Sequence, residues 1–190
     1  MTVGDILKYV GIMISRIDVC DYFGEQNNNG EETYFDILTL LKIINLVVSE
    51  LSSTYLPLTT EQNVTFDDGK FAYSDLEKKV VKILDVHDGM GNKISYTETA
   101  EYIELDSTYS STSALTVVYQ FAPEEYNEES EIDYDEKDIP ARVIAYGVAA
   151  EYCISQSRFD EATFHYDRYI SAIQELKGVK NRKIKARSWK

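Results

Sequence analysis

The spacing of apolar residues changes twice along the chain, and this change limits the fold more than any other feature. Up to Pro57, and again from Pro140, apolar side chains recur every three or four residues, as on one face of a helix. Between residues 62 and 123 they alternate or form short runs divided by turn residues, which indicates antiparallel strands. The pattern predicts an α+β fold, with N-terminal helices, a central antiparallel β insertion, and a C-terminal antiparallel helical hairpin with an extended basic arm.

The same changes of period, together with charge, divide the chain into segments. A length of 190 residues suits one domain, or one domain with appendages. The hairpin is expected to pack on the N-terminal helices, since both carry apolar faces. The predicted segments are N-terminal helices at 1–56, a β-rich insertion at 57–123, an acidic linker at 124–138, the hairpin at 139–178 and the C-terminal arm at 179–190.

Two helices are predicted before Pro57. The first covers residues 3–20, with Thr2 and Asp5 as a capping pair at its start. The second covers residues 33–53, and further apolar residues widen its stripe nearly all round. Such a helix needs cover on several sides, either from its own chain or from a neighbouring subunit, and the sequence leaves both open. The stripe consists of Phe35, Leu38, Leu41, Ile44, Val48 and Leu51.

Tyrosine content is a second indication of contacts between chains. The chain has 15 tyrosines and one tryptophan, and tyrosine is favoured at protein interfaces because its large apolar ring has a polar tip. The alternative is that these rings fill half-buried sites within the chain. The candidate subunit-contact residues are Leu41, Ile44, Val48, Tyr146 and Tyr169.

Turn residues mark the strands of the insertion. Asp68 and Gly69 form a dipeptide typical of a hairpin turn, and residues 88–92 predict a second turn. Residues 107–113 are predicted to form a polar loop before the last strand at 115–121. Short strands joined by turns favour a small antiparallel sheet or sandwich over a parallel α/β sheet.

The C-terminal hairpin has its own start and stop signals. Pro140 suits the first turn of a helix in which Ile144 and Val148 share a face. Residues 157–160 are predicted to connect this helix to the next and to cap it, and Gly178 is predicted to end the second helix. The apolar face of the second helix is predicted to consist of Phe159, Ala162, Tyr166, Tyr169, Ile173 and Leu176.

Charge is distributed unevenly along the chain. Residues 124–138 hold nine carboxylates and one lysine, a net charge of −8 within a chain of −14. Such a run is usually a solvated, flexible link, and a cation site is the functional alternative. Residues 177–190 hold seven lysines and arginines and no acid, so that the rest of the chain has a net charge of about −21.

The basic tail has three interpretations. It could dock into another protein and anchor through Trp189, bind nucleic acid, or remain a solvated tail. Docking is favoured, because the acidic body repels nucleic acid in general. The candidate docking residues are Lys180, Arg182, Lys183, Lys185, Arg187 and Trp189.

Signatures of catalysis and of cofactor binding are weak. His87 and His165 fall on different elements without metal-ligand neighbours, so a structural or surface role is expected for each. Cys20 and Cys153 lie in helical patterns and are expected to be free thiols in a reducing, intracellular setting. No signal peptide or membrane-spanning run is predicted. We therefore predict a protein that is not an enzyme and has no cofactor, no catalytic residues and no metal ligands.

The hairpin and the tail contain a distinctive sequence pattern, which we call the phrase. It consists of four segments, residues 139–153, 158–162, 166–169 and 184–189. This phrase resembles the C-terminal part of the head–tail connector proteins of tailed bacteriophages, which are also called portal adaptor or head completion proteins. The order of helices, β insertion and arm is also similar, although the large β insertion and the acidic segment depart from the family pattern.

The resemblance implies a virion structural protein at the neck, assembled in the host cytoplasm. It implies a homo-oligomeric ring, expected to be twelvefold, that joins the capsid portal to the tail. The partners would be the portal ring and other neck or tail proteins, with the arm reaching onto the portal. DNA would pass through the lumen without specific binding, and no membrane would be involved. The alternatives are another neck role, such as a stopper or tail-completion protein, and a helical interaction module unrelated to virions.

Overall fold

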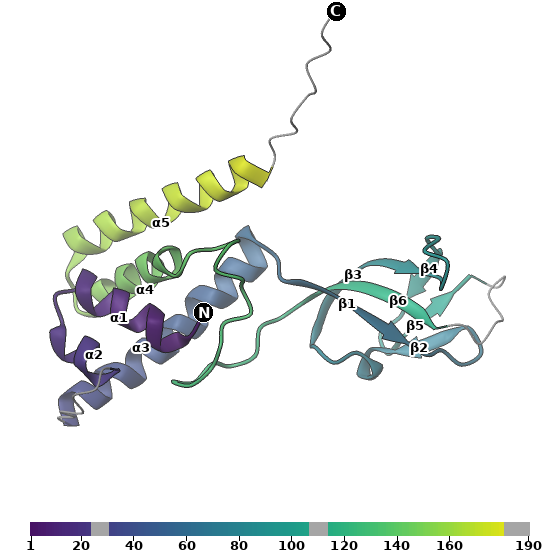
Figure 1. The fold of residues 1–190 in the computed structure, drawn as a ribbon, viewed down its shortest axis with the longest axis horizontal. Helices are drawn as coiled ribbons and strands as arrows, with labels where there is room; N and C mark the ends of the chain where they lie inside the picture. The colour runs from purple at the N-terminus through teal and green to yellow at the C-terminus, as the bar shows by residue number, and fades with distance from the viewer. Residues whose placement is uncertain (24–30, 107–113, 181–190) are drawn as a thin grey trace, which may run out of the picture. The chain divides into compact units, whose positions relative to one another are not determined.

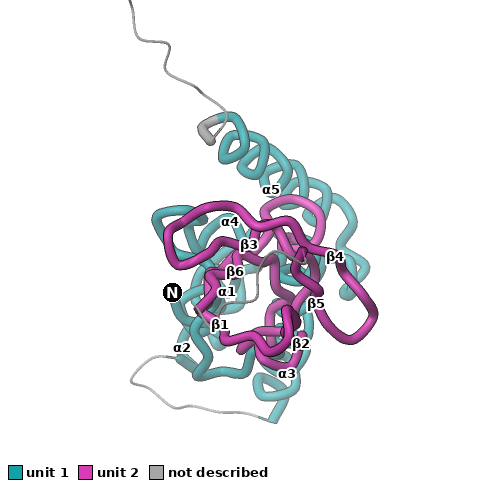
Figure 2. Tube along the Cα trace, turned by 90° about the vertical axis from the view of Figure 1, so that its right-hand side faces the viewer, with its two compact units in different colours: residues 1–50, 125–190 teal, residues 51–124 magenta. Residues whose placement is uncertain are grey.

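The fold is α+β, as the sequence predicts. The computed structural model describes the backbone of residues 1–23, 31–106 and 114–180, and side chains as far as Gly178 (Figure 1). The predicted loop at 107–113 and most of the predicted arm lie outside these residues. The chain forms two compact units, a helical unit of residues 1–50 and 125–190 and a β unit of residues 51–124 (Figure 2).

The helical unit is built around one central helix. It contains α1 (Val3–Met13), α2 (Ile17–Tyr22), α3 (Glu31–Glu50), α4 (Ala141–Ser155) and α5 (Phe159–Lys180). Helix α4 packs against α1, α3 and α5 (Figure 1). Ten of its 15 residues are buried, which its many small and aliphatic side chains allow. The expected packing of the hairpin on the N-terminal helices is therefore present.

The prediction of one helix over residues 3–20 is wrong, because the chain turns after Met13. Ser15 adopts a left-handed φ of +60°. The Arg16 N–H donates to the Gly11 carbonyl at 2.8 Å, and the Ser15 N–H donates to the Ile12 carbonyl at 3.3 Å. These two bonds form a Schellman motif, which ends a helix by satisfying its last carbonyls. The start of α1 agrees with prediction, since Thr2 and Asp5 form a reciprocal capping box.

The connection after α4 repeats that turn. Ser157 has a φ of +58°, and the Arg158 N–H donates to the Cys153 carbonyl at 2.8 Å. A serine and an arginine therefore follow both helices, although glycine is the commoner residue at the left-handed position. The connection predicted at residues 157–160 is present at Ser157 and Arg158, whereas Phe159 and Asp160 already belong to α5.

Two predicted helix faces agree only in part with those observed. The predicted residues Ile44 and Val48 of α3, and Ala162, Tyr169 and Ile173 of α5, are buried. On α3, Phe35 is 66% exposed, whereas Ile37 and Leu40 are fully buried. On α5, Tyr166 is 45% exposed and His165 occupies the core position beside it. Both stripes contained extra apolar residues, so periodicity alone could not select the buried side. Gly178 does not end α5, which continues to Lys180.

The acidic segment packs against the helices, so the prediction of a solvated link is wrong for most of it. We call residues 125–140 the acidic strap. Its Tyr126, Ile132, Tyr134 and Ile139 side chains are buried, while most of its carboxylates are exposed. The Val3 N–H donates to the Ser130 carbonyl at 3.0 Å. The strap is ordered because these four side chains provide the burial that its carboxylates cannot.

Asn45 of α3 and the N-terminus fix the strap at further points. The Asn45 side chain accepts from the Tyr126 N–H at 2.7 Å and donates to the Tyr126 carbonyl at 3.0 Å. The Ile132 N–H donates to the Met1 carbonyl at 2.9 Å. Backbone groups of the strap therefore find partners in two other segments of the helical unit, as burial requires.

A polar cluster joins α2, α3 and α4. The Arg16 guanidinium pairs with Asp18 and with Asp36, each at 2.6 Å, and donates to the Tyr152 hydroxyl at 3.2 Å. Thr33 donates to Asp18 at 3.0 Å. The hydrogen bond from Arg16 lowers the pKa of Asp18 to about 2, with a smaller contribution from Thr33. The cluster satisfies the charged groups at one end of the helical bundle.

The β unit contains two three-stranded antiparallel sheets. Their strand orders are β1-β6-β3 and β2-β5-β4. Asp68 and Gly69 both have positive φ, and Asp67 and Lys70 exchange two backbone hydrogen bonds of 2.9 Å, so the predicted hairpin turn is confirmed. The strands are β1 (Thr59–Val64), β2 (Lys70–Ala72), β3 (Val80–His87), β4 (Tyr96–Glu98), β5 (Tyr102–Leu105) and β6 (Leu115–Phe121).

Gly147 provides a test of the packing around α4. A Cβ atom at this position would lie 2.8 Å from Val47 Cγ1 and 3.1 Å from Tyr169 Cε2. We expect Gly147→Ala to lower the free energy of unfolding of the helical unit by about 1–3 kcal/mol, since Val47 and Tyr169 are stiff and buried. Urea unfolding followed by circular dichroism measures this change.

Gly178→Ala is the matched control for that substitution. Among the described residues, no atom lies within 4 Å of the Cβ position at Gly178, which is also in a helix. Alanine there should raise stability by up to about 1 kcal/mol, because it reduces the conformational freedom of the unfolded chain. Equal effects of the two substitutions would contradict the close approach at Gly147.

Candidate functional site

Three of the predicted subunit-contact residues are core residues of the helical unit. Ile44 and Val48 are fully buried, and Tyr169 is 1% exposed. Helix α4 packs against both α3 and α5, so side chains from these helices are covered within one chain. The prediction that these three residues contact another subunit is therefore corrected. Leu41 and Tyr146 are only half-buried and remain accessible to a partner.

The predicted docking arm lies almost wholly beyond the described residues. Lys180 is the last residue of α5, and its side chain is not described. The other five candidates, Arg182, Lys183, Lys185, Arg187 and Trp189, lie outside the described residues. The arm therefore stays a sequence-based prediction.

Tyr146 lies beside a surface hollow formed by α4 and α5. The hollow has a volume of about 440 Å³, and we call it the Arg–aromatic hollow. It lies between consecutive helices of the hairpin, which the Ser157 turn brings together. Its lining residues are Arg142 and Tyr146 from α4, and Phe164, Asp167, Arg168, Ser171, Ala172 and Glu175 from α5.

Arg168 is positioned by two aromatic rings. Its guanidinium carbon lies 4.6 Å from the centre of the Phe164 ring and 5.9 Å from the centre of the Tyr146 ring. Each such contact is worth about 0.5–1 kcal/mol at an exposed site. Phe164 precedes Arg168 by four residues on the same helix, so that the two side chains meet on one face. The rings restrict the arginine while leaving its N–H groups available for hydrogen bonds.

The lining of the hollow is typical of a protein-binding surface. Phe164 is 54% exposed, and an exposed phenylalanine gains free energy when a partner covers it. Arginine and aromatic residues are enriched at interface hot spots. Asp167 and Glu175 balance the charges of Arg142 and Arg168, so the hollow suits a partner with mixed polar and apolar groups.

Sequence reasoning missed Phe164 and Arg168. The apolar pattern of α5 was assigned to its buried face, and Phe164 falls outside that periodicity. A large aromatic residue that is out of phase with the core stripe was the available signal. Its meeting with Tyr146 depends on the packing of two helices, which helical spacing does not specify.

His165 lies next to Phe164 on α5 but belongs to the core. It is 6% exposed, and its Nδ1 atom has no hydrogen-bond partner among the described residues. Burial lowers the pKa of His165, and the charges of Arg168 and Arg158 lower it further, while Glu161 acts in the opposite direction. His87, on β3, is half-buried, so the two histidines lie in different units.

The described part of the chain contains no cluster of metal-ligating side chains. Among its His, Cys, Asp and Glu side chains, no group of three or more is placed to hold a metal ion, the acidic strap included. Cys20 and Cys153 are free thiols, and burial raises the pKa of each. Within the same residues, no helix has both the length and the apolar character that a membrane span needs.

No protein-family model matches the chain, and no curated protein matches it.

Burial of His165 predicts that stability depends on pH. Its native pKa lies below the unfolded value of about 6.5, so on acidification the unfolded chain takes up a proton that the native chain does not. The free energy of unfolding of the helical unit should therefore fall between about pH 7.5 and pH 5.5. His165→Leu should flatten this slope, as measured by urea unfolding at each pH.

His87→Leu is the control, because it removes a histidine from the β unit. It should preserve the pH slope of the helical unit, as followed by far-ultraviolet circular dichroism. A slope that persists in the His165→Leu protein would show that another group causes it.

Proposed function

We propose that this chain is a non-enzymatic assembly protein that joins the capsid portal of a tailed bacteriophage to the tail. The observation that carries the proposal is the Arg–aromatic hollow. It lies on the α4–α5 hairpin, which also contains most of the phrase that resembles head–tail connector proteins. One element therefore supplies both the resemblance and an exposed surface with hot-spot chemistry.

The proposed role is mechanical and needs a preformed surface. Helix α4 is buried against three other helices, so Arg142 and Tyr146 are held on a rigid element. A surface that is already ordered loses little conformational entropy on binding, which favours affinity. In the proposed ring, copies of the chain would associate side by side, expected to be twelve, and the basic arm would reach onto the portal.

The acidic character of the chain suits a channel through which DNA moves. A net charge of −14 gives a repulsive field toward phosphates, so DNA would pass without being held. The second candidate function is an interaction module outside a virion. The Arg–aromatic hollow favours it equally, since the hollow would accept any partner of matching shape and charge.

The first test of the proposal uses the hollow. Phe164→Ala combined with Arg168→Ala should weaken binding to purified portal rings by about tenfold or more, because it removes an exposed ring and a charge. Binding is measured by co-sedimentation and by mass in solution. Phe159→Ala is the control, since Phe159 is 63% exposed on the same helix and does not line the hollow.

The outcome separates the two candidate functions. If the Phe164→Ala, Arg168→Ala variant loses binding to portal and the Phe159→Ala variant keeps it, the connector role is supported. A wild-type chain that stays monomeric and never binds portal, with or without its tail, contradicts the connector role and leaves the interaction module.

A second test concerns the C-terminal arm. Deletion of residues 179–190 removes six of the chain's 19 basic residues and its single tryptophan. If the arm docks on the portal, the shortened chain should fold and lose no more helical content than the last two residues of α5 supply, but it should lose most of its affinity for portal rings. Retained affinity would show that the arm is not the docking element.

A further inference from the structure

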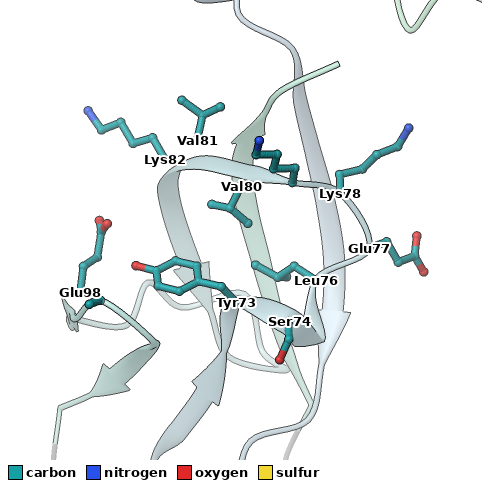
Figure 3. Close-up of a pocket in the computed structure, with 11 residues that line it drawn as sticks. Tyr73, Ser74, Leu76, Glu77, Lys78, Val80, Val81, Lys82 and Glu98 are labelled. Carbon is teal, nitrogen blue, oxygen red and sulfur yellow. The ribbon is translucent and has the colours of Figure 1, made fainter. Parts of the chain in front are cut away.

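The β unit has a hollow of its own, of about 550 Å³ (Figure 3). It lies between the first residues of β3, the short 3-10 turn Tyr73–Asp75 and Glu98 of β4. Its distinctive feature is a run of lysines at one edge, so we call it the lysine hollow. The lining residues are Tyr73, Ser74, Leu76, Glu77, Lys78, Lys79, Val80, Val81, Lys82, Glu98 and Ala100.

The hollow lies beside an edge strand. Strand β3 is the outer strand of the sheet β1-β6-β3. Its later residues are covered, since the Tyr96 hydroxyl donates to the Ile83 carbonyl at 3.3 Å and the Ile94 N–H donates to the Val86 carbonyl at 2.8 Å. Its first residues instead face the hollow, and an irregularity of register there leaves Val81 57% exposed.

The charge of the lysine hollow is opposite to that of the chain. Lys78, Lys79 and Lys82 line it, against the two carboxylates of Glu77 and Glu98, in a chain of net charge −14. Among the described residues, neither Lys79 nor Lys82 forms an ion pair within the chain, and Figure 3 shows the Lys82 side chain extended away from the ribbon. The hollow therefore offers cations and an exposed valine to an anionic partner.

The acidic strap of the helical unit has complementary chemistry. Its Glu129, Glu131, Asp135 and Glu136 side chains are exposed, while Ile132 and Tyr134 between them are buried. Backbone hydrogen bonds to Met1 and Val3 already order this segment, so binding would not have to order it again. The strap contains eight of the nine carboxylates of residues 124–138, the most acidic segment of the sequence.

We propose that the lysine hollow of one copy of this chain binds the acidic strap of a second copy. The inference rests on the self-assembly part of the proposed function and names the contact that would drive it. Each copy carries both a lysine hollow and an acidic strap, so the contact is heterologous, and such contacts close into a ring or extend into a filament. Since the contact pairs exposed charges, added salt should weaken it.

Cross-linking tests the contact directly. Chains labelled with 14N and with 15N are mixed and treated with a carbodiimide, which joins an amine to a carboxylate in direct contact. Mass spectrometry should find peptides of mixed label that join Lys79 or Lys82 to Glu129, Glu131, Asp135 or Glu136. The absence of such peptides from a concentrated mixture, or a chain that is monomeric at every concentration, overturns the inference.

A charge exchange tests the contact by a second route. Lys79→Glu with Lys82→Glu, and separately Glu129→Lys with Glu131→Lys, should each weaken self-association by about tenfold or more. Mixing the two variants should restore association, because each supplies the surface that the other needs. Lys42→Glu with Lys93→Glu is the control, since both lysines are exposed, neither lines the lysine hollow, and the change in net charge equals that of the first variant.

The outcomes distinguish this inference from the proposed function. If both charge-exchange variants still form rings on the portal as the wild-type chain does, the inference is wrong and the connector role stands. If mixing the two variants restores self-association but the wild-type chain never binds portal, the inference stands and the connector role is wrong. Loss of duplex DNA binding in the lysine variant, with self-association unchanged, overturns the inference and assigns the hollow to nucleic acid.

Discussion

The close approach of α3, α4 and α5 at Gly147 is the contact on which the helical unit depends. With no Cβ at this position, Val47 and Tyr169 reach the α4 backbone from two sides, and both are buried there. Packing at this density leaves no room for an added methyl group. The Arg16 cluster then joins α2, α3 and α4 through polar contacts that apolar packing cannot supply.

This arrangement explains how a strongly acidic segment becomes part of the fold. The acidic strap buries four apolar side chains and bonds to Asn45 and to the N-terminal residues, so its carboxylates are held at the surface. Unpaired charge stays hydrated, while the backbone finds partners in the protein. The result is an ordered anionic surface, which is more useful for recognition than a solvated link, since its geometry is fixed before binding.

The two candidate surfaces differ in their physical character. The Arg–aromatic hollow is nearly balanced in charge and relies on exposed rings and an oriented arginine. The lysine hollow is cationic and lies beside an edge strand. Apolar and aromatic contacts supply affinity that resists salt, whereas exposed charge pairs supply steering and partner choice. An assembly protein with a portal on one side and copies of itself on another would need both kinds of surface.

The sequence by itself determined the fold class, the capping box at Thr2, the hairpin turn at Asp68 and Gly69, and the order of the helical and β segments. These features depend on local spacing and backbone preference, which neighbouring residues specify. Tertiary structure alone decided the turn at Ser15, the buried side of α3 and α5, the order of the acidic strap, and the meeting of Phe164 with Tyr146. Each of these depends on packing between segments far apart in the chain, where burial of apolar area outweighs local propensity.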